Sequence, residues 1–149
     1  MKGKYFEEAD VGEKHKSSGR TITESDIVLF AGLSGDYSPP HTDDEFCKTT
    51  PFKKKIAHGL LTTSISSGLF TRTGVFQGTG LAHMGTTIKS TAPVYIGDTL
   101  HIEFTVGEKE EMDAERGWLL INLETVNQDG KVVAKENMKM MIARKPTSS

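Results

Sequence analysis

Two short segments of this 149-residue chain carry side chains that could move protons. In the first, Gly35-Asp36-Tyr37-Ser38-Pro39-Pro40-His41, a carboxylate and an imidazole lie five positions apart, on the order of 17 Å if extended. Gly35 permits unusual backbone angles and the two prolines stiffen the rest of the loop, so a fixed bend could direct Asp36 and His41 onto one water. Acid–base catalysis needs a pair held in place like this. The alternative is an ordinary helix end and turn, with Asp36 bonding backbone amides.

The second segment is Ile56-Ala57-His58-Gly59-Leu60-Leu61, at the predicted start of a helix. Free backbone N–H groups and the positive end of the helix dipole gather at such a start. Gly59 has no side chain, so a carbonyl oxygen could approach its amide and be polarised there. The alternative is a glycine needed only for close helix–sheet packing. His58 is expected to be a buried, hydrogen-bonded structural group rather than a catalyst.

The helices that position these segments have recognisable start signals. A helix is predicted to begin at Thr23, with Asp26 completing a capping-box-like arrangement. It is expected to stop at Ser38-Pro39-Pro40. A second capping box, Thr42-Asp43-Asp44-Glu45, predicts a short helix through Phe46. The apolar stripe of the first helix is Ile27, Phe30, Ala31 and Ser34.

The longest helical pattern covers roughly residues 58–72 and is poor in large polar groups. A helix of that composition is poorly suited to a solvent face, so we expect it to be enclosed, for example by a sheet. Its apolar stripe is Leu60, Leu61, Ile65 and Leu69.

The second half of the chain has the period-two alternation of strands. Strands are expected at 84–91, 99–106, 119–124 and 132–142, with a turn at 127–130 between the last two. Helices followed by antiparallel strands indicate an α+β fold in which one central helix packs against a sheet.

Composition narrows the class of protein. With 36% hydrophobic and 26% charged residues, the sequence suits one globular domain spanning 1–149, with a polar N-terminal segment and a loose tail at 146–149. The net charge of −2 gives no general attraction to nucleic acid or an anionic membrane. The start lacks a signal-peptide pattern, and no apolar run approaches the roughly 20 residues that span a bilayer. A single cysteine, Cys47, excludes an internal disulfide and fits a reduced, cytoplasmic setting.

Taken together, the two segments and Ser67-Gly68-Leu69 resemble the pattern of the MaoC-like (R)-specific enoyl-CoA hydratases and dehydratases. In that family the loop reads G-D-x-N-P-aliphatic-H, and the buried helix opens with I-A/V-H-G-M/L. The resemblance covers about residues 20–143, and two motifs in one order are more specific than either alone. It implies a hot-dog fold, an antiparallel sheet wrapped around a long central helix.

The resemblance also implies roles for matching residues. Asp36 and His41 would activate the water, and the Gly59 amide would bind the thioester oxygen. Ser67 matches a serine that supports the site, with Ser38 and His58 as further supporting residues. The implied reaction is (R)-specific hydration of a trans-2-enoyl-CoA, or the reverse dehydration of an (R)-3-hydroxyacyl-CoA.

Two residues depart from the family pattern. Ser38 stands where asparagine is usual, and Pro40 where an aliphatic residue is usual. A serine hydroxyl forms hydrogen bonds but lacks the reach and the dual function of an amide. These changes bear on substrate range and rate more than on the class of reaction, because both presumed proton-transfer residues remain.

Two other functions are considered. A hot-dog acyl-CoA thioesterase usually carries its carboxylate on the central helix, and residues 59–69 contain no acid. A non-catalytic acyl-thioester-binding module fits Ser38 but not the retention of Asp36 and His41.

The resemblance implies an acyl-CoA or acyl-carrier-protein thioester as substrate and a homodimer or higher homo-oligomer as the assembly. It implies no metal and no cofactor apart from the coenzyme A of the substrate, and neither a nucleic-acid nor a membrane partner. Lys53-Lys54-Lys55 could meet phosphates of coenzyme A or an acidic carrier protein, but a solvated loop is the preferred interpretation.

Overall fold

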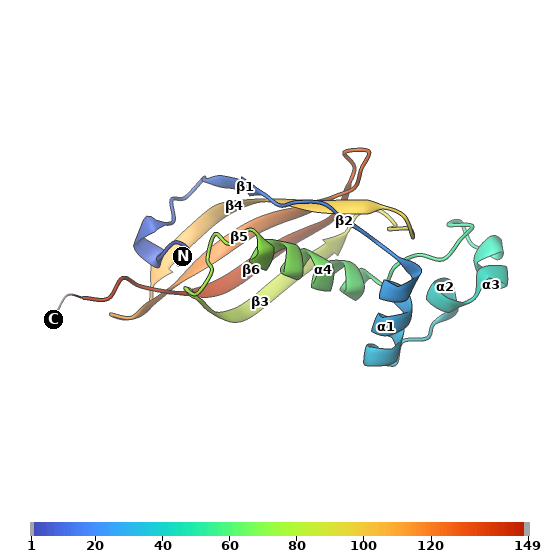
Figure 1. Ribbon diagram of the computed structural model, residues 1–149, viewed down its shortest axis with the longest axis horizontal. Helices are drawn as coiled ribbons and strands as arrows, with labels where there is room; N and C mark the ends of the chain where they lie inside the picture. The colour runs from blue at the N-terminus through green and yellow to red at the C-terminus, as the bar shows by residue number, and fades with distance from the viewer. Residues whose placement is uncertain (1, 148–149) are drawn as a thin grey trace.

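The second half of the chain forms an antiparallel sheet, whose strands are drawn one beside another in Figure 1. The computed structural model describes residues 2–147. The spatial order of the strands is β1-β4-β5-β6-β3, and β2 pairs with β4 beside β1. The strands are β1 (Lys14–Lys16), β2 (Arg20–Thr21), β3 (Gly80–Ser90), β4 (Thr99–Glu111), β5 (Arg116–Val126) and β6 (Val132–Ala143).

One face of this sheet forms the core. Along residues 99–106 of β4 and 116–125 of β5, every second side chain is buried, as period-two alternation requires. Phe104 on β4 lies opposite Leu123 on β5, so the buried positions share a face. The predicted strands are confirmed. Each is longer than expected because pairing continues past the apolar residues that predicted it, although β3 ends at Ser90, one residue before its expected end.

Helix α4 (Gly59–Arg72) lies across the buried face of the sheet (Figure 1). Its bounds agree closely with the expected 58–72. The expectation of an enclosed helix is only half right for this chain, because the face away from the sheet is exposed. Leu60, expected in the apolar stripe, is 64% exposed. The buried residues of α4 are Leu61, Thr62, Ile65, Ser66, Leu69 and Phe70.

Three further helices lie beyond the start of α4 (Figure 1). Helix α1 (Glu24–Ser34) begins as predicted, with Thr23 and Asp26 forming a capping box. The predicted second capping box is wrong. Asp43 caps α3 (Asp44–Thr49), because Thr42 already belongs to the preceding helix.

That preceding helix, α2 (Pro39–Thr42), is an addition to the sequence-based prediction. Pro39 and Pro40 occupy its first two positions, where the missing N–H groups cost nothing and the fixed φ angle favours a helix. The expected stop at these prolines is therefore wrong: α1 ends earlier, at Ser34 before Gly35, and the prolines start a new helix.

The N-terminal segment follows the β4 edge of the sheet. After the 3-10 helix η1 (Phe6–Glu8), strands β1 and β2 both pair with β4. Of the tail expected at 146–149, residues 148 and 149 lie outside the described residues. Within residues 2–147, no helix combines the length and apolar composition needed to cross a bilayer.

Candidate active site

Asp36 follows a sharp turn at the end of α1. Gly35 has a φ of 78°, in the left-handed region that glycine adopts without steric cost. Its N–H donates to the Ala31 carbonyl at 2.8 Å, which closes the helix. The Asp36 side chain thus leaves the end of α1 at a fixed point.

One oxygen of the Asp36 carboxylate is held by Ser38. The Ser38 N–H donates to Oδ1 at 3.1 Å, and the Ser38 hydroxyl donates to the same atom. The hydroxyl bond, and then the N–H bond, keep the pKa of Asp36 below its ordinary value. Asp36 is exposed and therefore ionised at neutral pH, with Oδ1 occupied by the serine that replaces the family's asparagine.

His41 is held by the segment that leads into α4. Its Nδ1 lies 2.7 Å from the Ile56 carbonyl oxygen, and the Ile56 N–H donates to the Pro40 carbonyl at 3.1 Å. A carbonyl only accepts, so Nδ1 of His41 must carry the proton. In the neutral ring, Nε2 is therefore a free acceptor.

His58 contacts both Asp36 and His41. It is 2% exposed, and its Nε2–H donates to the Asp36 backbone carbonyl at 2.9 Å. Its ring stacks on His41, with centroids 3.8 Å apart, and also contacts Phe30 at 4.8 Å. The position of His58 ahead of Gly59 therefore fixes the backbone of Asp36 and the ring of His41, the two candidate proton-transfer residues.

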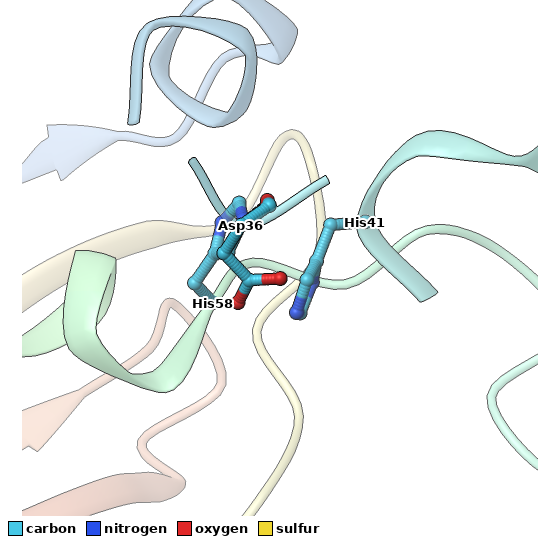
Figure 2. Close-up of side chains that lie close together, drawn as sticks. All are labelled: Asp36, His41 and His58. Atoms are coloured by element: carbon cyan, nitrogen blue, oxygen red, sulfur yellow. Dashed lines mark hydrogen bonds between the residues drawn. The ribbon is translucent and has the colours of Figure 1, made fainter. Parts of the chain in front are cut away.

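The three polar side chains converge. One polar side-chain atom from each of Asp36, His41 and His58 lies within 4.8 Å of the others. In Figure 2 the Asp36 carboxylate points toward the His41 ring. Chain segments that are five and 22 positions apart thus meet within the reach of one water molecule.

The same three groups are a possible metal-ligand set, and the ring geometry argues against it. An imidazole binds a metal in its ring plane at about 2.0–2.1 Å. The planes of His41 and His58 are stacked only 26° apart, so they do not meet within that distance of both rings. The arrangement suits proton transfer better than a shared ion.

Gly59 opens α4 beside this cluster. Among residues 2–147, none accepts a hydrogen bond from its N–H. A pocket of about 350 Å³ adjoins it, and His41, Gly59 and Ser90 are among the lining residues. A Cβ on Gly59 would lie 3.3 Å from Ser90 Oγ, so the missing side chain keeps this approach to the amide open. The amide end of α4 is therefore available to a substrate carbonyl.

Ser67 lies outside this group. It is exposed on α4, and its carbonyl accepts a hydrogen bond from Thr71. The neighbouring Ser66 is the buried serine, and it donates to Glu136 of β6 at 2.6 Å. The supporting role of Ser67 remains a prediction.

Sequence reasoning missed Ser90 and the full role of His58. Ser90 is 31 positions from Gly59, and no local spacing marks it. His58 was expected to be a structural group, and only the folded chain shows that it contacts both Asp36 and His41.

A larger hollow of about 620 Å³ lies away from the cluster and includes Lys16, Glu103, Glu124 and Lys135. Its charges are largely paired, with Lys16 to Glu103 at 3.5 Å and Lys135 to Glu124 at 3.1 Å. His15 and Glu136 also line this hollow, but the convergent group at His41 and the Gly59 amide do not, so the smaller pocket at Gly59 is the candidate site.

Known proteins share both the sequence pattern and the fold. The family model of the MaoC-like domain matches residues 7–128. An (R)-specific enoyl-CoA hydratase of Rhodospirillum rubrum is 45% identical over 103 residues, which are 68% of this chain and 69% of that protein.

Two solved structures are similar over nearly the whole chain. One, a monoamine oxidase regulatory protein of an Archaeoglobus, has a TM-score of 0.91 at 36% identity and covers 98% of each chain. The other, a MaoC-like dehydratase of Rhodospirillum rubrum, has a TM-score of 0.89 at 28% identity, over 97% of this chain and 100% of that one.

The fold and the site define a hot-dog enzyme of the hydro-lyase class. The chain belongs to the MaoC-like dehydratase family.

Proposed function

We propose that this protein catalyses the (R)-specific hydration of trans-2-enoyl-CoA, or the reverse dehydration. The observation that carries the proposal is the convergence of Asp36 and His41 within 4.8 Å, beside a pocket that reaches the Gly59 amide. The relative that is named an (R)-specific enoyl-CoA hydratase supports the choice of substrate.

The proposed reaction uses the Gly59 N–H as the electron sink. When that amide binds the thioester oxygen, electron density leaves the C2=C3 double bond and C3 becomes electrophilic. The N-terminal end of the α4 dipole acts in the same direction.

Asp36 and His41 hold the water. Its two hydrogens are directed to the free oxygen of Asp36 and to Nε2 of His41, because both atoms are acceptors. As the C3–O bond forms, one of these groups takes a proton from the water and then delivers a proton to C2 on the same face. One O–H bond of water and the π bond between C2 and C3 are broken, and a C3–O bond and a C2–H bond are formed. No other reactant is consumed.

We propose no metal or redox cofactor, since the carbonyl is polarised by a backbone amide. We also propose a homodimer, in line with the apolar side chains that this chain leaves exposed near the site: Leu29 is 72%, Leu33 is 85% and Leu60 is 64% exposed. Among residues 2–147, strand β3 pairs only with β6, so its other edge is open to a second copy. A cytoplasmic setting and the absence of nucleic-acid and membrane partners remain part of the proposal.

The test is hydration of crotonyl-CoA and longer enoyl-CoAs, followed by the loss of the conjugated-thioester absorbance. Asp36→Asn and His41→Ala should each lower the rate by a factor of about 10²–10⁴. Matched controls are Asp129→Asn in the β5–β6 turn and His101→Ala on β4. Full hydration by both site variants would contradict the mechanism.

The same assay separates the two alternatives. Release of free coenzyme A would indicate a thioesterase, for which α4 offers no acidic side chain. Binding of the thioester without turnover would indicate a non-catalytic module.

A further inference from the structure

The loop between α3 and α4 forms part of the rim of the substrate pocket. Phe52 and Ile56 both line the pocket. The loop is fastened to Tyr95, whose hydroxyl donates to the Phe52 carbonyl at 3.3 Å and whose backbone forms a β-bridge with Ile56. The three lysines between Phe52 and Ile56 are therefore carried at the pocket entrance.

Lys55 is already occupied. Its side chain is only 15% exposed and lies 2.5 Å from Glu24 and 3.5 Å from Asp44. The hydrogen bond to Glu24 raises the pKa of Lys55, which opposes the effect of burial. Lys55 thus ties the loop to α1 and α3. Its ammonium is already paired with two carboxylates and is not available to a ligand.

Unlike Lys55, the side chains of Lys53 and Lys54 are not paired with acidic groups in the described residues. Both are exposed, and neither forms an ion pair with a carboxylate anywhere in residues 2–147. The Lys54 ammonium lies over the Tyr95 ring, 4.5 Å from its centroid, and this contact holds the cation at the rim. The rim therefore carries two cations without an acidic partner.

The backbone of Lys53 is strained. With a φ of 66°, it is the sole non-glycine residue of the described chain in the left-handed region. Strained backbone concentrates at binding and catalytic segments, where the surrounding structure holds it in place. Here Lys55 and the Tyr95 contacts provide that support. The Lys53 ammonium reaches only the Lys48 carbonyl, at 3.4 Å.

We propose that Lys53 and Lys54 bind the phosphate groups of the coenzyme A part of the substrate. The proposal rests on the hydratase function proposed above. Gly59 lies six positions after Lys53, which limits their spacing to about 20 Å. That limit is comparable with the reach of an extended pantetheine arm. A thioester bound at the Gly59 amide would therefore place its nucleotide phosphates near the two free cations.

The test compares crotonyl-CoA with crotonyl-pantetheine, which has the same thioester and arm but no nucleotide phosphates. In the double variant Lys53→Ala/Lys54→Ala, the KM for crotonyl-CoA should rise about tenfold with kcat little changed, since both lost ion pairs are exposed. The kinetic constants for crotonyl-pantetheine should stay as in the wild type. Added NaCl should raise the KM for crotonyl-CoA in the wild type and have much less effect in the variant.

The matched control is Lys14→Ala/Lys131→Ala, which removes the same charge from the sheet edge and the β5–β6 turn. An unchanged KM for crotonyl-CoA in the rim variant would overturn the proposal. So would an equal loss with both substrates, which would show that the loop had collapsed. If the rim variant is impaired only with a crotonyl-carrier protein as substrate, the lysines bind a protein partner instead. Failure of the wild type to hydrate even crotonyl-pantetheine would reject the proposed function itself.

Discussion

The rings of His41 and His58 are stacked, with their centroids 3.8 Å apart and their planes at 26°. His58 also donates from Nε2 to the Asp36 carbonyl at 2.9 Å, so one buried ring contacts both proposed proton-transfer residues. Its Nδ1 is buried and has no hydrogen-bond partner within residues 2–147. The ring therefore contacts these two residues through Nε2 and through its stacked face, and we infer that it acts by positioning them.

We therefore expect His58→Phe to lower kcat for crotonyl-CoA hydration by a factor of about 10–100, with a smaller change in KM. Phenylalanine preserves the stacking surface but leaves the Asp36 carbonyl without its donor, at a cost of about 1–3 kcal/mol in stability. His58→Gln, whose amide can replace the Nε2–H donor, should recover part of kcat. Steady-state kinetics with thermal unfolding will test this. Lower stability with unchanged kcat would contradict the positioning role.

Gly59→Ala should lower activity without lowering the stability of the fold. Alanine favours a helix over glycine by about 0.5–1 kcal/mol, so the global fold should tolerate the change. The new methyl group would lie 3.3 Å from Ser90 Oγ, in the approach to the amide. We expect kcat/KM to fall by a factor of about 10²–10³, as when an oxyanion donor is lost.

The control for this change is the double variant Gly59→Ala/Ser90→Ala. Removing the Ser90 hydroxyl relieves the contact with the added methyl group but does not clear the approach to the amide. Stability should stay close to that of the wild type, and activity should not return. Full recovery of activity in the double variant would mean that the close approach to the Gly59 amide is not needed.

Ser38→Ala should raise the pKa of Asp36 toward its ordinary value of 3.8, because the hydroxyl is the largest cause of the lowering. NMR titration of the Asp36 carboxyl carbon measures this directly. Activity at pH 7 should fall less than tenfold, since Asp36 stays ionised. Ser34→Ala is the matched control, because Ser34 bonds the Asp36 backbone rather than its carboxylate. A collapse of activity without a pKa change would give Ser38 a different role.

Local patterns predicted most of the fold. The capping box at Thr23, the helix at 58–72 and the alternating strands each depend on short-range rules, and each is confirmed. The errors arose where two signals overlapped. Pro39-Pro40 was interpreted as a stop alone, although proline also suits a helix start. The exposed face of α4 was not predicted because small residues can pack against any surface. Their pattern does not distinguish the sheet of the same chain from a second copy of the chain.

The candidate site was predicted in part. The spacing of Asp36 and His41 suggested a bend, and the prolines were expected to hold it. The structure adds longer-range contacts: Ile56 holds the His41 ring and His58 holds the Asp36 backbone. Bonds between segments 15 and 22 positions apart leave no periodic signal, so only a folded chain shows them.

Glu136 is the one carboxyl group in the described chain that is buried against α4, at 4% exposure. Burial raises its pKa, and the hydrogen bond from Ser66 and the charge of His83 lower it less. Its folded pKa therefore lies above the unfolded value of 4.5. Above pH 4.5 the unfolded chain releases a proton that the folded chain still holds, so stability should decrease as the pH rises through the folded pKa.

Glu136→Gln removes that titration while keeping an oxygen to accept the Ser66 hydroxyl. We therefore expect the variant to be more stable than the wild type at pH 8, and the difference to shrink toward pH 4, in urea unfolding measured across this range. Ser66→Ala should have the opposite effect. Without the hydrogen bond the pKa of Glu136 rises further, so the loss of stability continues to higher pH and becomes larger in total. Parallel stability curves for all three proteins would show that Glu136 is already ionised inside the fold.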